Sequence, residues 1–105
     1  MAAPGNRIRK KPRNDDFYKA ILLLENEEEC GSFFRDVCSQ TELSAMEQRF
    51  EVARLLRQGY VYNEILERTG ASSATISRVA RSLNDSTGGY QCVFERMGII
   101  SGEKA

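Results

Sequence analysis

The side chains best suited to bind a partner lie in one stretch of the chain, residues 72–81. This stretch supplies hydroxyls, small side chains and two arginines, and no carboxylate occurs between Arg68 and Asn84. A helix that lies against a polyanion needs such a face, because arginine pairs with phosphate and with guanine edges whereas a carboxylate is repelled. The residue types therefore predict a surface that contacts nucleic acid.

Helical spacing assigns these side chains to one face of a helix over residues 73–83. Ile76 and Leu83, with Val79 or Ala80 between them, recur at the period of one buried stripe. The opposite face is small at its start and basic further on, and it carries Ser73, Ala74, Thr75, Ser77, Arg78 and Arg81. The buried stripe thus leaves this set exposed to a partner.

Residues 62–83 together have the pattern of a helix-turn-helix, the motif that places a short helix in the DNA major groove. Ile65 and Leu66 give the first helix an apolar side. Gly70 can adopt the positive φ of a sharp turn, and Ser72 can cap the second helix by accepting a backbone N–H. A plain two-helix hairpin would share the apolar pattern, but glycine, cap and acid-free face occur together here, which favours the helix-turn-helix.

The exposed residues of the motif have predicted roles on DNA. The first turns of a recognition helix reach base edges, and the residues placed there are Ser73, Ala74, Ser77 and Arg78. Arg78 has two open interpretations, a bidentate contact to guanine O6/N7 or a phosphate contact. The candidate backbone contacts are Asn63, Arg68 and Arg81. Ser72 and Thr75 complete the predicted DNA-binding set, while Arg49, Arg54 and Arg57 of the preceding helix either reach phosphate or only solvate that helix.

The composition argues against catalysis and against a metal site. The chain has no histidine, which removes the commonest general base and metal ligand. Its three cysteines, Cys30, Cys38 and Cys92, form no C-x-x-C pair, so neither a disulfide framework nor a zinc site is predicted. Cys30 and Cys38 are interpreted as small apolar residues on a helix. We expect no enzyme activity, no metal and no cofactor.

Charge is segregated along the 105 residues, although the net charge is zero. Residues 1–14 hold five cations and two prolines, which predicts a disordered basic arm that either touches phosphate or only solubilises the chain. Residues 15–100 are expected to form one helical domain, followed by a tail at 101–105. No apolar run approaches the ~18–20 residues of a membrane helix, so we expect a soluble cytoplasmic protein without membrane contact.

The apolar periods predict an all-α domain of about six helices. Asp15 or Asp16 is expected to cap the first helix. Asn26 with Glu29 resembles the capping box of a second helix that begins near Glu27. The chain is therefore expected to enter its second helix after a short break.

Two more helices flank the helix-turn-helix. Ser44 with Glu47 is interpreted as a capping box, so a third helix is expected from residue 45 to about residue 58. Gly59 is expected to close it. The last helix is expected to begin near Tyr90 and to end at Gly98.

The first two predicted helices carry more apolar surface than a chain of this size hides easily. The large side chains involved are Phe17, Ile21, Leu24, Phe33, Phe34 and Val37. An ordinary monomeric core is one alternative, and a homodimer in which these helices pack against those of a partner is the other. The dimer also suits DNA, because a two-fold protein presents two recognition helices about one turn, ~34 Å, apart.

Residues from about 17 to 97 resemble the Trp repressor superfamily, and most closely its YerC/YecD branch of small regulators. The resemblance rests on three stretches, residues 48–53 (QRFEVA), 69–78 (TGASSATISR) and 88–96 (GGYQCVFER). It implies an intertwined, all-helical homodimer that binds double-stranded DNA through the helix-turn-helix. The implied function is sequence-specific regulation of transcription, most simply repression.

One departure from the family pattern concerns the corepressor. In Trp repressor the tryptophan lies against the recognition helix, beside an arginine followed by a glycine. Arg78 matches that arginine, but Val79 stands where the glycine would be, and its isopropyl group would fill the space of the indole ring. The second ligand-site arginine corresponds to Gln48 in an ungapped match and to Arg49 after a shift of one residue. We therefore expect no tryptophan binding.

Two alternatives to a plain DNA-binding regulator stay open. One is a dimeric protein-interaction module built on the helix-turn-helix scaffold. The other is a regulator that senses a different small molecule. Salt-dependent binding to DNA separates the first of these from a regulator.

Overall fold

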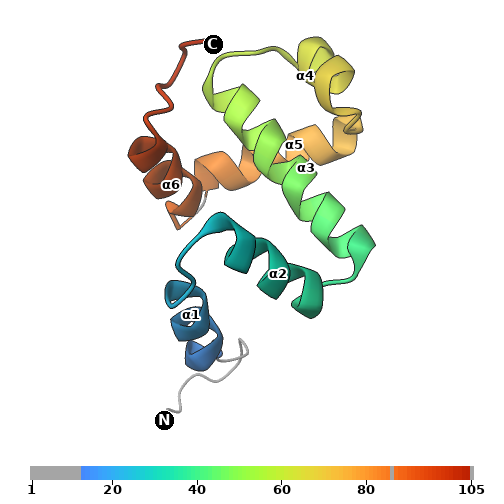
Figure 1. The fold of residues 1–105 in the computed structure, drawn as a ribbon. Coiled ribbons are helices and arrows are strands. Elements are labelled where there is room, and N and C mark those ends of the chain that lie inside the picture. Colours follow the sequence, from blue (N-terminus) through green and yellow to red (C-terminus); the bar gives the residue numbers. More distant parts are fainter. Residues whose placement is uncertain (1–12, 86, 105) are drawn as a thin grey trace, which may run out of the picture. The chain divides into compact units, whose positions relative to one another are not determined.

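The computed structural model describes residues 13–85 and 87–104, and this part of the chain contains six helices and no strand. The helices are α1 (Asp15–Leu22), α2 (Glu27–Val37), α3 (Gln40–Arg57), α4 (Tyr62–Thr69), α5 (Ser73–Asp85) and α6 (Gly89–Met97), shown in Figure 1. The all-α prediction is confirmed. The chain divides into two compact units, residues 1–37 and residues 38–105.

Both helices of the first unit begin at an asparagine. The Asn14 side chain accepts the Phe17 N–H at 3.2 Å. The prediction that Asp15 or Asp16 caps α1 is therefore wrong, and these two carboxylates instead occupy the first turn, where the helix dipole favours negative charge. Most of the predicted basic arm, residues 1–12, lies outside the described residues.

The predicted start of α2 is confirmed. The Asn26 side chain accepts the Glu29 N–H at 2.9 Å, which satisfies one of the free donors of the first turn. The Glu29 carboxylate accepts from the backbone N–H of Glu25 at 2.9 Å, one residue before the cap. The two side chains therefore close the turn that precedes α2.

The first unit leaves several apolar side chains exposed and the others only half-buried. Among its described residues, neither α1 nor α2 contains a buried one. The Phe17 and Phe33 rings approach to 6.1 Å between centroids, but Leu22 and Leu23 remain 83% and 77% exposed. Apolar side chains exposed to this degree mark a surface that is stabilised when it is covered.

Helix α3 begins earlier than the sequence indicated. Ser39 and Glu42 form a complete capping box, with the Glu42 N–H donated to Ser39 Oγ at 3.1 Å and the Ser39 N–H donated to the Glu42 carboxylate at 2.8 Å. The expected box of Ser44 and Glu47 is wrong, because both residues lie inside the helix. Both pairs fit the same motif, and the structure uses the earlier one.

The interpretation of two cysteines is also wrong. Cys30 lies on α2 but is exposed, and Cys38 lies in the bend after α2 and is only half-buried. Neither therefore fills a core position within this chain.

The core of the second unit forms where α3 packs against α5 and α4, as Figure 1 shows. Its buried apolar residues are Val52, Ala53, Leu55, Tyr60, Ile65, Ala71, Ile76, Val79 and Phe94. Phe94 anchors α6 to this core, with its ring 5.3 Å from that of Phe50 and 5.8 Å from that of Tyr90. The helix-turn-helix is thus packed on a long, rigid helix.

Both predicted glycine ends in this unit are confirmed. Gly59 follows α3 with φ +95°, and Gly98 ends α6 with φ +77°. The segment expected to be a tail does not extend freely, because its Gly102 N–H is donated to the carbonyl of Arg57 at the end of α3. No helix in the described part of the chain is long and apolar enough to cross a membrane.

Candidate nucleic-acid interface

Helices α4 and α5 and the turn between them form the helix-turn-helix that the sequence predicts. Helix α4 begins at Tyr62 and α5 begins at Ser73, as expected, while α5 continues to Asp85, beyond the predicted end at residue 83. Gly70 adopts the left-handed conformation with φ +72°, and its N–H is donated to the Leu66 carbonyl at 2.8 Å. A side chain at this position would strain the turn, which explains the glycine.

Thr69, the last residue of α4, and Ala71 in the turn hold the two helices of the motif in place. The sequence analysis did not assign them this role. The Thr69 hydroxyl donates to the Ile65 carbonyl at 2.7 Å and accepts the Ala71 N–H at 3.1 Å. Ala71 is buried and belongs to the apolar core of the second unit. A threonine next to a turn glycine is a signal that could have revealed this role, because its hydroxyl can satisfy turn backbone groups.

Ser72 caps α5, which confirms the prediction. Its Oγ accepts the Thr75 N–H at 3.1 Å and also lies 3.1 Å from the Thr75 hydroxyl. Thr75 is half-buried, whereas Ser72 is exposed. Both hydroxyls are therefore engaged in forming the start of α5, and their primary role is to fix that end of the helix.

The two faces of α5 differ as the spacing predicts. Ile76 and Val79 are buried in the core, and Ala80 is half-buried. The exposed face carries the other predicted contacts of this helix, Ser73, Ala74, Ser77, Arg78 and Arg81. The only carboxylate on α5 is Asp85 at its last position. The structure thus brings the predicted side chains together on one solvent-facing surface.

The two candidate DNA contacts on α4, Asn63 and Arg68, are also exposed, and Arg68 packs on an aromatic ring. Asn63 lies at the second position of the helix. The Arg68 guanidinium lies 4.5 Å from the centroid of the Tyr60 ring, which is a cation–π geometry. Leu66, predicted as part of the apolar side, is instead 45% exposed, and Ile65 alone of that pair is buried.

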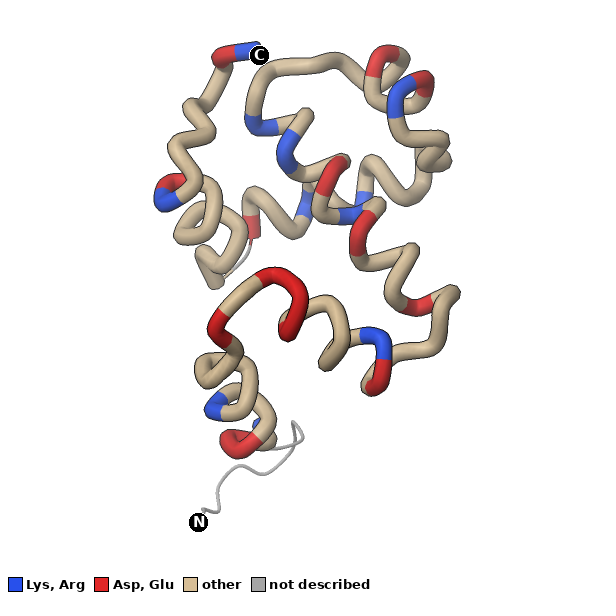
Figure 2. The backbone as a smooth tube through the Cα atoms, viewed as in Figure 1, with Lys and Arg blue, Asp and Glu red and all other residues tan. Residues whose placement is uncertain are grey.

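The arginines of α3 have different surroundings. Figure 2 shows Lys and Arg in blue on the C-terminal half of α3 and on α5. Arg54 donates to the Glu51 carboxylate, and this pairing raises the pKa of its guanidinium. Arg54 also donates to the side-chain oxygen of Gln58 at 2.8 Å. Arg57 donates to the Ile99 carbonyl at 2.8 Å. These two side chains therefore serve the fold, while Arg49 is exposed.

Gln48 joins α3 to the turn of the motif. Its side-chain amide donates to the Thr69 carbonyl at 3.1 Å and is half-buried. The last carbonyls of a helix lack partners within the helix, so this bond satisfies one of them. The sequence offered this residue only as a possible counterpart of a ligand-site arginine, and nothing local in the sequence indicates its contact across 21 residues.

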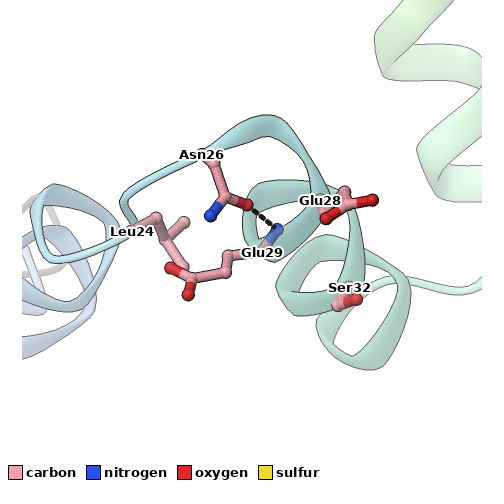
Figure 3. Close-up of a pocket in the computed structure, with 5 residues that line it drawn as sticks. All are labelled: Leu24, Asn26, Glu28, Glu29 and Ser32. Atoms are coloured by element: carbon pink, nitrogen blue, oxygen red, sulfur yellow. Dashed lines mark hydrogen bonds between the residues drawn. The ribbon is translucent and has the colours of Figure 1, made fainter.

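Each of the two units has a hollow at its surface. Figure 3 shows one in the first unit, where the Asn26 cap and the Glu29 N–H meet beside Leu24, Glu28 and Ser32. The second, of about 490 Å³, is an open apolar groove lined by Phe50, Ser82, Thr87, Gly89, Tyr90 and Val93. Within the described residues, no cluster of three or more histidine, cysteine, aspartate or glutamate side chains could hold a metal ion.

Comparison with known proteins gives concordant matches. The family model described as Trp repressor protein matches residues 13–98. The uncharacterised protein YerC of Bacillus subtilis (strain 168) is 46% identical over 83 residues, which cover 79% of this chain and 80% of that protein. Among solved structures, a candidate Trp repressor from Staphylococcus aureus is 46% identical with a TM-score of 0.80, covering 83% of this chain and 87% of the other. A TrpR-like protein from Eubacterium eligens ATCC 27750 is 49% identical with a TM-score of 0.79, covering 83% and 90%.

Proposed function

The chain belongs to the Trp repressor family, and we propose that it is a sequence-specific DNA-binding regulator that acts as a homodimer and represses transcription. Family membership supports a helix-turn-helix regulator, not an enzyme. The observation that carries the proposal is the exposed face of α5, which gathers hydroxyls and two arginines beside a buried stripe. That face has the side-chain chemistry of a major-groove reading surface.

The proposed docking places the start of α5 in the major groove. Ser73, Ala74 and Ser77 lie on the first turns, where small side chains let the helix approach base edges closely. Arg78 follows them on the same exposed face, within reach of either guanine or phosphate. The surrounding phosphates are assigned to Asn63, Arg68 and Arg81.

The proposed homodimer accounts for the uncovered first unit. Leu22 and Leu23 on and after α1, and Val37 at the end of α2, are each more than half exposed in the single chain. A second copy could cover this surface, and a two-fold arrangement would present two α5 helices to successive major grooves, ~34 Å apart. The same apolar surface also supports the alternative of a protein-interaction module, since another protein could cover it.

The proposed regulator does not use tryptophan as its effector. Val79, at the position where the family pattern has glycine, is only 2% exposed and fills part of the core. Gln48, one possible counterpart of a ligand-site arginine, already donates its amide to Thr69. A regulator that senses another small molecule stays open, and the groove beside Tyr90 is the hollow in the second unit that such a ligand could use.

Selection of bound sequences from a random duplex pool tests the proposal, followed by binding of the enriched duplex at several salt concentrations. A regulator should enrich a site with two-fold symmetry and bind it with a steep salt dependence, because each phosphate contact releases counterions. Weak binding without enrichment would contradict the proposal, and it would direct the search to a protein that pairs with the first unit.

A further inference from the structure

The segment that follows α6 returns to the end of α3. The Arg57 side chain donates through Nε to the Ile99 carbonyl at 2.8 Å. In the opposite sense, the Gly102 N–H donates to the Arg57 carbonyl at 2.7 Å. Arg57 therefore holds this segment against the last turn of α3 through its side chain and through its backbone carbonyl.

Two glycines meet where this segment crosses the link from α3 to α4. Gly59 adopts φ +95° and Gly102 adopts φ +77°. A Cβ built on Gly59 would lie 3.6 Å from the Gly102 Cα, so the two backbones are in contact at this point. The segment thus packs on the short connection, residues 58–61, that sets the direction in which α4 leaves α3.

The end of the segment reaches the first turn of α4. Lys104 Nζ lies 3.4 Å from the Glu64 carboxylate, and 4.9 Å from the centroid of the Tyr60 ring. That carboxylate also accepts the Val61 N–H at 3.0 Å, which caps α4. Lys104 therefore contacts Glu64, whose carboxylate caps α4, and Tyr60, which lies just before the helix.

We propose that residues 99–104 form a strap that positions the helix-turn-helix for DNA binding. The proposal rests on the DNA-binding function proposed above and assigns the strap a positioning role within it. Helix α4 spans Tyr62–Thr69, too short to be stable by itself, so its direction depends on what holds its two ends. Gln48 holds the C-terminal end at Thr69, and the strap holds the N-terminal end at Glu64.

The direction of α4 controls the reading surface because the turn to α5 is tight. Only residues 70–72 separate the two helices, and Ala71 within them is buried. A loosened first turn of α4 therefore displaces α5 relative to the phosphates that Asn63 and Arg68 would contact. Gly102 and Lys104 are exposed, so loss of their contacts should permit local opening of α4 while the core around Phe94 stays packed.

The test uses full-length variants of the strap. Gly102→Pro removes the N–H that bonds to Arg57 and excludes the positive φ of this position. Lys104→Met removes the contact with Glu64, and Lys104→Arg keeps the charge as a conservative rescue. Arg96→Met, on the exposed side of α6, is the matched control because it removes one cation from the same unit without touching the strap.

Two readouts are compared for each variant. Hydrogen exchange is followed at the amides of residues 65–69 in α4 and of residues 52–55 in the core of α3. Affinity is measured on the duplex enriched by selection, at a temperature where circular dichroism shows every variant folded.

The strap proposal has a distinctive expected result. Gly102→Pro and Lys104→Met should speed exchange in α4 but not in α3, and should weaken DNA binding ~3–10-fold, the effect of losing one exposed polar contact. Lys104→Arg and Arg96→Met should match the parent chain in both readouts.

Unchanged exchange in α4 together with unchanged affinity would overturn the strap proposal. Faster hydrogen exchange in both α4 and α3 would also overturn it, because residues 99–104 would then stabilise the whole second unit and would not position α4. If the parent chain binds no duplex selectively, the proposed function fails instead, and the exchange readout still decides whether the strap holds α4.

Discussion

The side-chain amide of Gln48 on α3 donates to the main-chain carbonyl of Thr69, the last residue of α4, at 3.1 Å. This one bond connects the helix that forms the core to the turn that sets the direction of α5. Because Thr69 also bonds to Ile65 and Ala71, the corner of the motif is held by contacts from three sides.

Replacing Gln48 by methionine should loosen this corner. The variant keeps the length of the side chain but leaves a helix-end carbonyl without its donor, a loss of ~0.5–1.5 kcal/mol in the free energy of unfolding. Thermal unfolding and binding to the enriched duplex measure the effect. Gln91→Met on α6, where the amide donates to Glu95 at the surface, is the matched control and should be nearly neutral. Equal behaviour of the two variants would contradict the assignment to Gln48.

The role of Arg78 on DNA can be separated from that of Arg81. Arg78→Ala should relax the preference at one base step of the selected site, since a bidentate contact to guanine is worth ~1–3 kcal/mol. Arg81→Ala should instead weaken binding to all duplexes alike. It should also reduce the slope of log affinity against log salt concentration by about one, the share of one phosphate contact. Affinities for a set of single-base variants of the site measure both effects. If Arg78→Ala also weakens binding uniformly, Arg78 contacts phosphate.

Tryptophan should neither bind nor change DNA affinity. The Val79 side chain is buried where a ring would need open space, and the amide of Gln48 is committed to Thr69. Isothermal titration of the protein with tryptophan should therefore give no binding heat, and duplex affinity should be the same with and without the amino acid. Stoichiometric binding at micromolar concentration would show that the expectation is wrong.

A polar substitution on α1 should weaken the proposed homodimer. Leu22→Gln removes an apolar side chain that is 83% exposed in the single chain, and a leucine fully covered in an interface contributes ~1.5–3 kcal/mol. Sedimentation across a range of concentrations should show a shift toward monomer. Lys19→Gln, on the same helix, introduces the same side chain at an exposed polar position and should leave the association unchanged. No shift for Leu22→Gln would place the interface elsewhere.

Two capping carboxylates should make the fold sensitive to acid. The backbone N–H of Ser39 lowers the pKa of Glu42, and that of Val61 lowers the pKa of Glu64, with Lys104 adding to the second shift. A carboxylate with a lowered pKa stabilises the fold above its unfolded value, about pH 4.3 for glutamate, and this contribution is lost as pH falls through the lower folded value. Unfolding of Glu42→Gln should be easier than that of the parent chain at pH 7, and the difference should shrink toward pH 3. A constant difference across this range would contradict the linkage.

The helix-turn-helix could be predicted from the sequence because the residues that define it lie close together in the chain. Gly70, the Ser72 cap and the stripe of Ile76 and Val79 each follow from residues within one or two turns, and the structure places them as predicted. The exposed face of α5 then follows from helical geometry alone.

The features that the sequence did not predict also have a physical explanation. Two Ser-x-x-Glu capping boxes fit the start of α3, and the structure uses the one formed by Ser39 and Glu42. Two hydrogen bonds join residues far apart in the chain, from Gln48 to Thr69 and from Gly102 to Arg57, and no local sequence pattern predicts them. The missed residues are therefore those that position the motif, while the residues that form its surface were found.

In the proposed function the exposed face of α5 lies against DNA, and one substitution tests this directly. Ser77→Glu places a carboxylate in the middle of that exposed face without touching the core, whereas Gln91→Glu makes the same change of charge on the exposed side of α6. Both variants should fold, as judged by thermal unfolding, and their affinity for the selected duplex is then compared. Ser77→Glu should lose at least ~100-fold in affinity, because a charge buried against phosphates and base edges is both repelled and desolvated, and Gln91→Glu should bind like the parent chain. Binding by Ser77→Glu at the parent affinity would show that α5 is not the reading helix.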